Sequence, residues 1–119
     1  MKNDNALQQK SYSFAIRTVR AYQFLTSEKK EYVLSKQFLR SGTSIGANVE
    51  EAIGGQTDKD FFAKLNIVYK EARETHYWIR PLKDTDYFDS LQAESQLKDC
   101  DEILKITGTI IKTLKNRNS

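Results

Sequence analysis

The chain has 119 residues, of which 39% are hydrophobic and 29% charged, with a formal charge of +3 from 19 basic and 16 acidic side chains. That size suits one domain with a real core and excludes two, and the charge is far below that of a dedicated nucleic-acid-binding arm. No apolar run reaches the ~20 residues that cross a bilayer, the N-terminus lacks the apolar block of a signal peptide, and the single cysteine excludes an internal disulfide. We therefore expect a soluble, cytoplasmic protein with no membrane partner.

Four segments have the 3.6-residue hydrophobic period of an amphipathic helix, and none shows the sustained alternation of a strand. The first is expected over residues 5–25, with its main apolar face formed by Leu7, Phe14, Ala21 and Leu25. The second is expected over residues 29–53, because Gly54 and Gly55 supply a natural left-handed stop. The third opens at residue 57 and ends at residue 81.

The signals for the third helix are a threonine and a proline. Thr57 can cap the helix, with Asp60 three residues later in the pattern of a capping box. Pro81 is expected to end it, since a proline cannot continue a helix without losing a backbone hydrogen bond. The core line of this helix consists of Phe61, Leu65, Val68, Ala72 and Ile79.

The fourth helix is expected to begin at Asp89 or Ser90 and to fray near Asn116. Its apolar and small residues recur at alternating spacings of four and three, as in a heptad seam: Ala93, Leu97, Cys100, Leu104, Thr107, Ile111 and Leu114. Short connections make sequential helices antiparallel neighbours. We therefore predict an all-α fold, an up-down-up-down antiparallel four-helix bundle that forms a single domain over residues 1–119.

Two glycines stand in the middle of the second helix, where each costs about 1 kcal/mol relative to alanine. Gly42 and Gly46 are four residues apart and therefore share one helix face. Without side chains there, a partner backbone can approach closer than the usual distance of roughly 8–10 Å between helix axes. The pair predicts tight helix packing in water, because this helix is too polar for a membrane.

A polar face lies opposite the glycine pair and has a counterpart on the third helix. An antiparallel pair of helices could align these residues into a connected network of charges and hydrogen bonds. The second helix contributes Arg40, Ser44, Asn48 and Glu51, and the third contributes Lys64, Glu71 and Glu74.

Two helices carry more apolar surface than one core requires. A second line on the first helix consists of Tyr12, Ile16 and Val19, and Ile67 and Trp78 lie nearly opposite the core line of the third. One reading is that Trp78 folds over a neighbouring helix end, and single exposed apolar residues are common. We favour self-association, with these five residues as the oligomer interface.

The sequence points away from catalysis. Hydrolysis would need an activated nucleophile or a bound metal, and the only histidine, His76, has no obvious acidic partner. Cys100 lies on the heptad seam and is expected to be a small core residue. We expect no catalytic residues, cofactor, metal or small-molecule substrate.

The stretch RSGTSIGANVEEA carries a family resemblance. The stretch resembles the signature of the 23S ribosomal RNA intervening-sequence proteins, which are also catalogued as four helix bundle proteins. That signature has an arginine, a serine–isoleucine step, an asparagine and a glutamate, which here are Arg40, Ser44-Ile45, Asn48 and Glu51. The family glycine that follows is absent at position 53, unless the next residue replaces it. The third helix is also similar, at Asp60-Phe61, Leu65, Glu71, Glu74 and Trp78. The similarity covers most of residues 10–115.

The resemblance implies a small up-down-up-down bundle that forms homopentameric rings and has no established enzymatic activity. Some relatives are basic pentamers that bind RNA and a reverse transcriptase. It therefore suggests a homo-oligomer whose partner is structured RNA or a ribonucleoprotein. The candidate RNA contacts are Lys10, Arg17, Arg20, Lys112, Lys115 and Arg117, although each could equally belong to a solvated face. The alternative is a protein-interaction scaffold that binds no nucleic acid.

Overall fold

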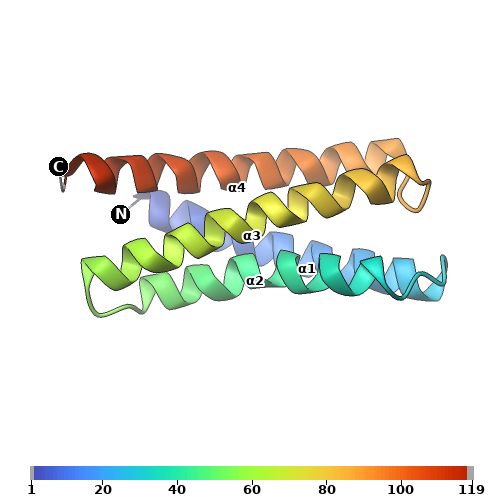
Figure 1. Ribbon diagram of the computed structural model, residues 1–119, viewed down its shortest axis with the longest axis horizontal. Helices are drawn as coiled ribbons and strands as arrows, with labels where there is room; N and C mark the ends of the chain where they lie inside the picture. The colour runs from blue at the N-terminus through green and yellow to red at the C-terminus, as the bar shows by residue number, and fades with distance from the viewer. Residues whose placement is uncertain (1, 118–119) are drawn as a thin grey trace.

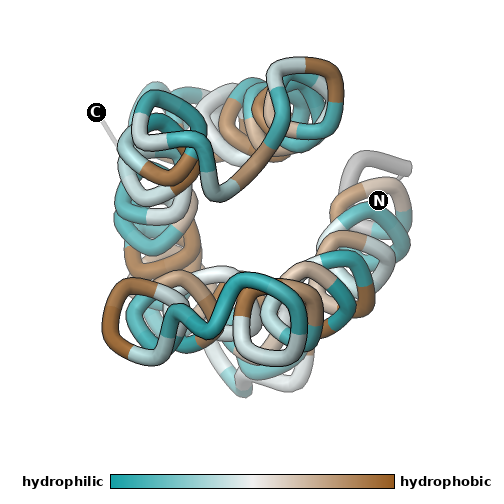
Figure 2. Tube along the Cα trace, turned by 90° about the vertical axis from the view of Figure 1, so that its right-hand side faces the viewer, coloured by the Kyte–Doolittle hydropathy of each residue, from teal (hydrophilic) through white to brown (hydrophobic). Residues whose placement is uncertain are grey.

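The computed structural model describes residues 2–117, which form four antiparallel helices (Figure 1). These are α1 (Lys2–Ser27), α2 (Leu34–Ile53), α3 (Asp58–Asp84) and α4 (Ser90–Arg117). The helices are arranged around a common centre (Figure 2), sequential helices pack side by side, and α4 also contacts α1. The molecule is an elongated rod of 48 × 21 × 21 Å. The predicted four-helix bundle is confirmed, with no strand among the described residues.

Among the residues that the structure describes, none of the helices combines the length and the apolar character that a membrane crossing would require.

The core contains the expected faces of the first three helices. On α4 the buried face is rotated about the helix axis relative to the predicted one. Leu7, Phe14 and Leu25 are buried, as predicted. On α4, however, Ile103 and Ile110 are buried, whereas their neighbours Leu104 and Ile111 only pack against the core from its edge. The predicted seam still forms part of the buried face, because Ala93, Cys100, Thr107 and Leu114 are buried together with these isoleucines. The buried face turns toward Ile103 and Ile110 because α4 contacts α3 and α1 on two sides.

Helix α2 begins five residues later than predicted. Lys30 adopts φ of 54°, in the left-handed region, which interrupts the helical path before α2. The Glu31 carboxylate then accepts hydrogen bonds from the backbone N–H groups of Val33, Leu34 and Ser35, at 3.3, 3.1 and 2.7 Å. Glu31 thus serves as the cap of α2. Sequence patterns missed it because Ser, Thr, Asp and Asn are the usual caps.

We expect Glu31→Gln to lower the free energy of unfolding at neutral pH by about 1–2 kcal/mol, as for the loss of other helix caps. Burial opposes ionisation of Glu31, but the hydrogen bonds from residues 33–35 outweigh it and hold the pKa below its ordinary value. The charged carboxylate is therefore the stabilising form. Its contribution is present above the unfolded-state pKa of about 4.3 and is lost as the pH falls through the lower folded value.

Urea unfolding of the wild type and Glu31→Gln at neutral and acidic pH measures this effect. The stability gap should narrow once the pH falls below the unfolded-state pKa of Glu31 and should close below its lower folded-state pKa. Glu28→Gln, at an exposed position just before the same turn, should stay within about 0.5 kcal/mol of the wild type. A gap that does not change with pH would contradict the capping role.

The prediction that α3 ends at Pro81 is wrong. The helix begins as expected, with Thr57 Oγ1 accepting the Asp60 N–H at 3.0 Å, but it continues to Asp84. Pro81 lies in the last turn, where its missing N–H removes one hydrogen bond while the following residues still close the helix. The N–H of Thr85 donates to the Pro81 carbonyl at 3.0 Å. Helix α4 is capped as predicted, because Asp89 accepts the Gln92 N–H at 2.7 Å.

Candidate functional site

The glycine pair of α2 faces α1 at close range. A Cβ added at Gly42 would lie 2.5 Å from Thr18 Cγ2, and one added at Gly46 would lie 3.2 Å from the backbone oxygen of Ser11. Ser11 and Thr18 are buried, and their hydroxyls donate to carbonyls of their own helix. The α1–α2 contact therefore joins bare backbone to short side chains, and the sequence analysis did not identify α1 as the partner.

An ion-pair network joins the polar faces of α2 and α3. Arg40 pairs with Glu71 at 3.1 Å and also with Glu74, and Lys64 pairs with Glu51 at 2.9 Å. The indole N–H of Trp78 donates to Glu74 at 3.0 Å. Partial burial opposes ionisation of Glu74, but its hydrogen bonds from the indole and the guanidinium hold its pKa below the ordinary value.

Two predicted members of this network make no bond across the helix pair. Ser44 Oγ donates to the Arg40 carbonyl at 2.6 Å, and Asn48 Nδ2 donates to the Ser44 carbonyl at 2.8 Å. Short polar side chains on a helix often bond to the carbonyl one turn earlier, and this local bond replaces the expected contact with α3. Their hydrogen bonds therefore run along α2, from Asn48 to Ser44 and from Ser44 to Arg40, and do not reach α3.

The second apolar line of α1 lies on the surface. We call Tyr12, Ile16 and Val19 the α1 stripe, and their exposed fractions are 64%, 41% and 39%. Ile67 on α3 is also exposed. Trp78, by contrast, is half-buried against the core beside the α2–α3 network, as in the alternative considered from the sequence. The stripe is therefore the more accessible apolar surface.

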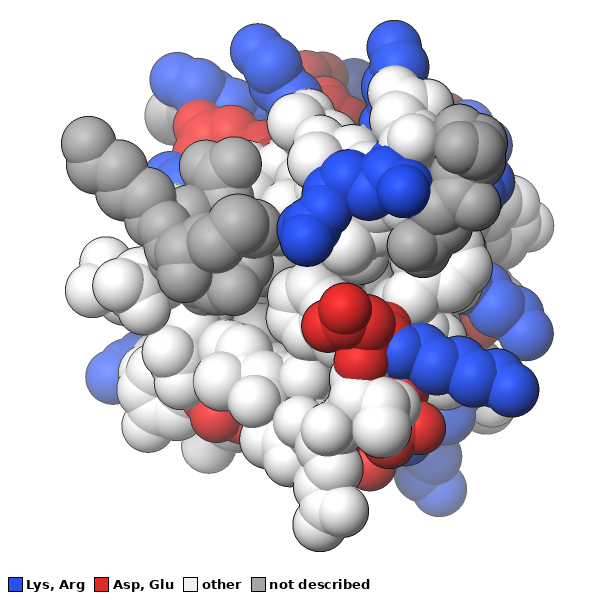
Figure 3. All heavy atoms as spheres, turned by 90° about the vertical axis from the view of Figure 1, so that its left-hand side faces the viewer, with Lys and Arg blue, Asp and Glu red and all other residues white. Residues whose placement is uncertain are grey.

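The candidate RNA contacts divide into two groups. Lys10 pairs with Glu102 at 2.9 Å and Arg17 with Asp99 at 2.7 Å, so both connect α1 to α4. The other four are exposed and have no ion pair with the side chains of residues 5–117: Arg20, Lys112, Lys115 and Arg117. Figure 3 views the bundle end where α4 finishes, on which basic and acidic side chains are interspersed.

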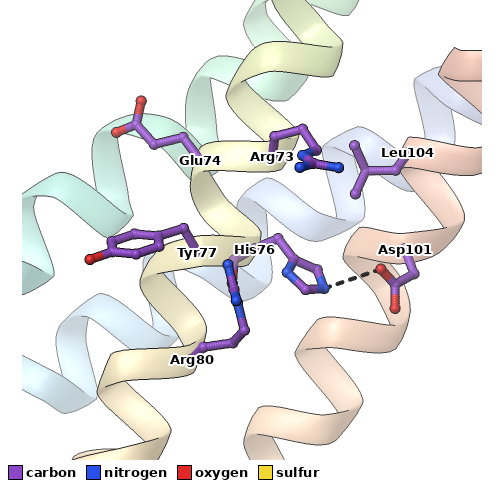
Figure 4. A pocket seen from close by; sticks show the side chains of 7 residues that line it. All are labelled: Arg73, Glu74, His76, Tyr77, Arg80, Asp101 and Leu104. Carbon is purple, nitrogen blue, oxygen red and sulfur yellow. Dashed lines mark hydrogen bonds and ion pairs between the residues drawn. The ribbon is translucent and has the colours of Figure 1, made fainter.

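A groove that sequence reasoning missed lies between α3 and α4 and has a volume of about 550 Å³ (Figure 4). Its wall on α3 includes Arg73, His76, Tyr77 and Arg80. Contrary to expectation, His76 has an acidic partner, because its Nε2 lies 3.2 Å from the carboxylate of Asp101 on α4. Periodicity alone does not reveal this pair, since it depends on how α3 and α4 align.

The buried thiol is positioned as a core group. Cys100 Sγ contacts the Ala72 carbonyl at 3.2 Å, and burial raises its pKa to about 12. The thiol therefore stays protonated near neutral pH and is a poor nucleophile. Within the described part of the chain, no three His, Cys, Asp or Glu side chains gather in a way that could hold a metal ion.

Comparisons with known proteins agree with the fold. The family model described as 23S rRNA-intervening sequence protein matches residues 3–109. A solved structure from Bacteroides thetaiotaomicron, described as a protein with unknown function from the S23 ribosomal protein family, is 52% identical. The match covers 92% of this chain and 98% of that one, with a TM-score of 0.91. No curated protein matches the chain.

Proposed function

The chain belongs to the 23S rRNA-intervening sequence protein family, and from that membership we propose that it is a non-enzymatic subunit of a homopentameric ring that associates with structured RNA or a ribonucleoprotein. The observation that carries the proposal is the exposed α1 stripe. The bundle already has a core formed by all four helices, so this second apolar line is not needed for folding. In a ring each subunit contacts two neighbours through different surfaces, and the stripe and the Ile67 region provide two.

The charge distribution supports association with RNA once copies assemble. Each subunit has a formal charge of +3, and its exposed cations include three near the end of α4: Lys112, Lys115 and Arg117. Binding to phosphates depends on how many cations engage together, so a ring that repeats this cluster binds more strongly than one subunit. The number five rests on the family resemblance.

Light scattering combined with absorbance at two wavelengths tests both parts of the proposal, because it reports subunit number and bound nucleic acid together. We expect a mass near five times the protomer mass of 13.8 kDa. Titration with structured RNA at rising salt should give affinity that falls as salt increases. A lone protomer at high concentration would remove the ring, and no RNA binding even at low salt would remove the RNA partner.

One observation favours the alternative, a protein-interaction scaffold. Lys10 and Arg17 are engaged by Glu102 and Asp99, so two of the expected phosphate contacts already neutralise acidic groups of the same chain. A ring that forms at the expected mass but binds no RNA at low salt would support the scaffold.

A further inference from the structure

The groove between α3 and α4 has cations at both ends of its α3 wall. Arg73 and Arg80 are exposed and are separated by two helical turns, about 10.5 Å along the axis. Among the side chains of residues 5–117, no carboxylate forms an ion pair with either guanidinium. In Figure 4, Arg73 extends toward α4, and Arg80 turns back along α3, where its Nε donates to the His76 carbonyl. Both are available to bind phosphate oxygens.

An aromatic surface lies beside these cations. Tyr77 is 51% exposed, and its ring packs against that of Trp78 in a T-shaped arrangement, with a centroid separation of 5.0 Å. The Arg80 guanidinium carbon lies 5.7 Å from the centre of the Tyr77 ring. Tyrosine rings and arginine planes are the groups on which unpaired bases stack. The structure thus provides a platform that the sequence analysis did not find.

The opposite wall carries an acceptor. Asp101 on α4 has a side chain that is 63% exposed, and it contacts His76 Nε2 through one carboxylate oxygen. A carboxylate repels a phosphate but accepts a hydrogen bond from a hydroxyl. The ribose 2′-hydroxyl is such a donor and is the group by which proteins distinguish RNA from DNA. A nucleotide would therefore direct its phosphates to the α3 arginines and its sugar to α4.

We propose that this groove binds an unpaired nucleotide of single-stranded RNA, with its base on Tyr77 and Arg80, its phosphates at Arg73 and Arg80, and its 2′-hydroxyl at Asp101. The proposal rests on the proposed function and deepens it, because exposed cations alone would recognise only backbone or shape. Duplex RNA keeps its bases stacked and does not fit this arrangement.

The α4 side of the groove lies away from the subunit contact expected in the proposed ring. Ile67 and Trp78 share a face of α3, at positions i and i+11, and Trp78 bonds to Glu74 beside α2. His76 faces α4 instead, through Asp101. The expected subunit contact therefore adjoins the groove at Glu74 and Tyr77, whereas the side of the groove formed by His76 and Asp101 faces α4.

Fluorescence anisotropy with a labelled oligouridine, an oligodeoxyuridine of equal length and a duplex RNA tests the groove. Tyr77→Leu should weaken oligouridine binding about tenfold and leave duplex binding unchanged. Tyr32→Leu removes an equally exposed ring at the α1–α2 turn and should change neither. Arg73→Gln should lower the salt slope for oligouridine by about 0.7, whereas Lys36→Gln should not. Asp101→Ala should bring the ratio of oligouridine to oligodeoxyuridine affinity close to one.

The outcomes separate this proposal from the proposed function. If the wild type binds RNA but the groove variants behave like their controls, the groove assignment is overturned while RNA association stands. If the wild type binds none of the three probes at low salt, the proposed RNA partner is overturned, and the groove with it. Circular dichroism should show every variant folded, because each substituted side chain lies at the surface.

Discussion

Replacing Gly42 by leucine is expected to lower the free energy of unfolding by about 3 kcal/mol, at the upper end of the range for overpacked cores. Leucine is the better helix former by roughly 0.8 kcal/mol, so helix propensity alone predicts the opposite sign. We expect destabilisation because a Cβ added at Gly42 would lie only 2.5 Å from Thr18 Cγ2, which is a steric clash. Thr18 is buried, β-branched and bonded through its hydroxyl to the Phe14 carbonyl at 2.8 Å, so it cannot move aside without losing that bond.

The matched control is another helical glycine. An added Cβ at Gly108 would lie 3.5 Å from Tyr69, an ordinary contact, so Gly108→Ala should raise stability by up to about 1 kcal/mol. Gly42→Ala should lower it, and serves as the milder variant if the leucine protein does not fold. Urea unfolding at one fixed protein concentration compares them, since oligomers gain stability with concentration.

A substitution at Thr18 tests whether the steric clash with this residue is what destabilises the Gly42 variants. Thr18→Ala removes the atoms that an added Cβ at Gly42 would meet, so the double variant with Gly42→Ala should be more stable than the two separate losses predict. Additive losses, or equal effects of alanine at Gly42 and Gly108, would show that close approach of α1 and α2 is not why the glycine is there.

The fold could be predicted because each helix carries its hydrophobic period within its own residues. The predicted start of α2 and the predicted end of α3 were wrong, because the usual residue preferences for helix starts and ends do not hold there. Glu31 caps α2 although glutamate is an uncommon cap, and Pro81 is tolerated because it falls in the last turn of α3. The buried face of α4 depends on two neighbouring helices at once, so its seven-residue pattern located the face only to within one position.

The candidate site was less predictable, because its parts come from different helices. The network of Arg40, Glu71 and Glu74 could be anticipated, since α2 and α3 are sequential and their polar faces have matching spacing. The pair of His76 and Asp101 could not, since it depends on the register between α3 and α4. The same limitation applies to Lys10 and Arg17, whose acidic partners lie at distant positions on α4.

If the chain assembles as proposed, substituting the α1 stripe with glutamine at Tyr12 and Ile16 is expected to reduce the native mass from that of the proposed ring to that of the 13.8 kDa protomer. Both side chains are exposed in the single chain, at 64% and 41%, so the bundle loses little packing when they change. A ring loses them from every interface at once, where buried aromatic and aliphatic anchors contribute most of the association energy. Glutamine is a good helix former and adds no charge, so the helix propensity of α1 and the net charge available for RNA binding stay unchanged.

The control is a variant in which two other exposed apolar side chains, at the other end of the bundle, are replaced by glutamine. Tyr32 and Leu91 are 54% and 84% exposed, on the α1–α2 turn and the first turn of α4, and neither belongs to the stripe. Glutamine at both positions should leave the native mass unchanged in light scattering. If this control dissociates the ring as readily as the stripe variant, general surface hydrophobicity holds the copies together. If the stripe variant keeps the full mass, subunits join elsewhere, and the extra apolar line on α1 must serve another contact.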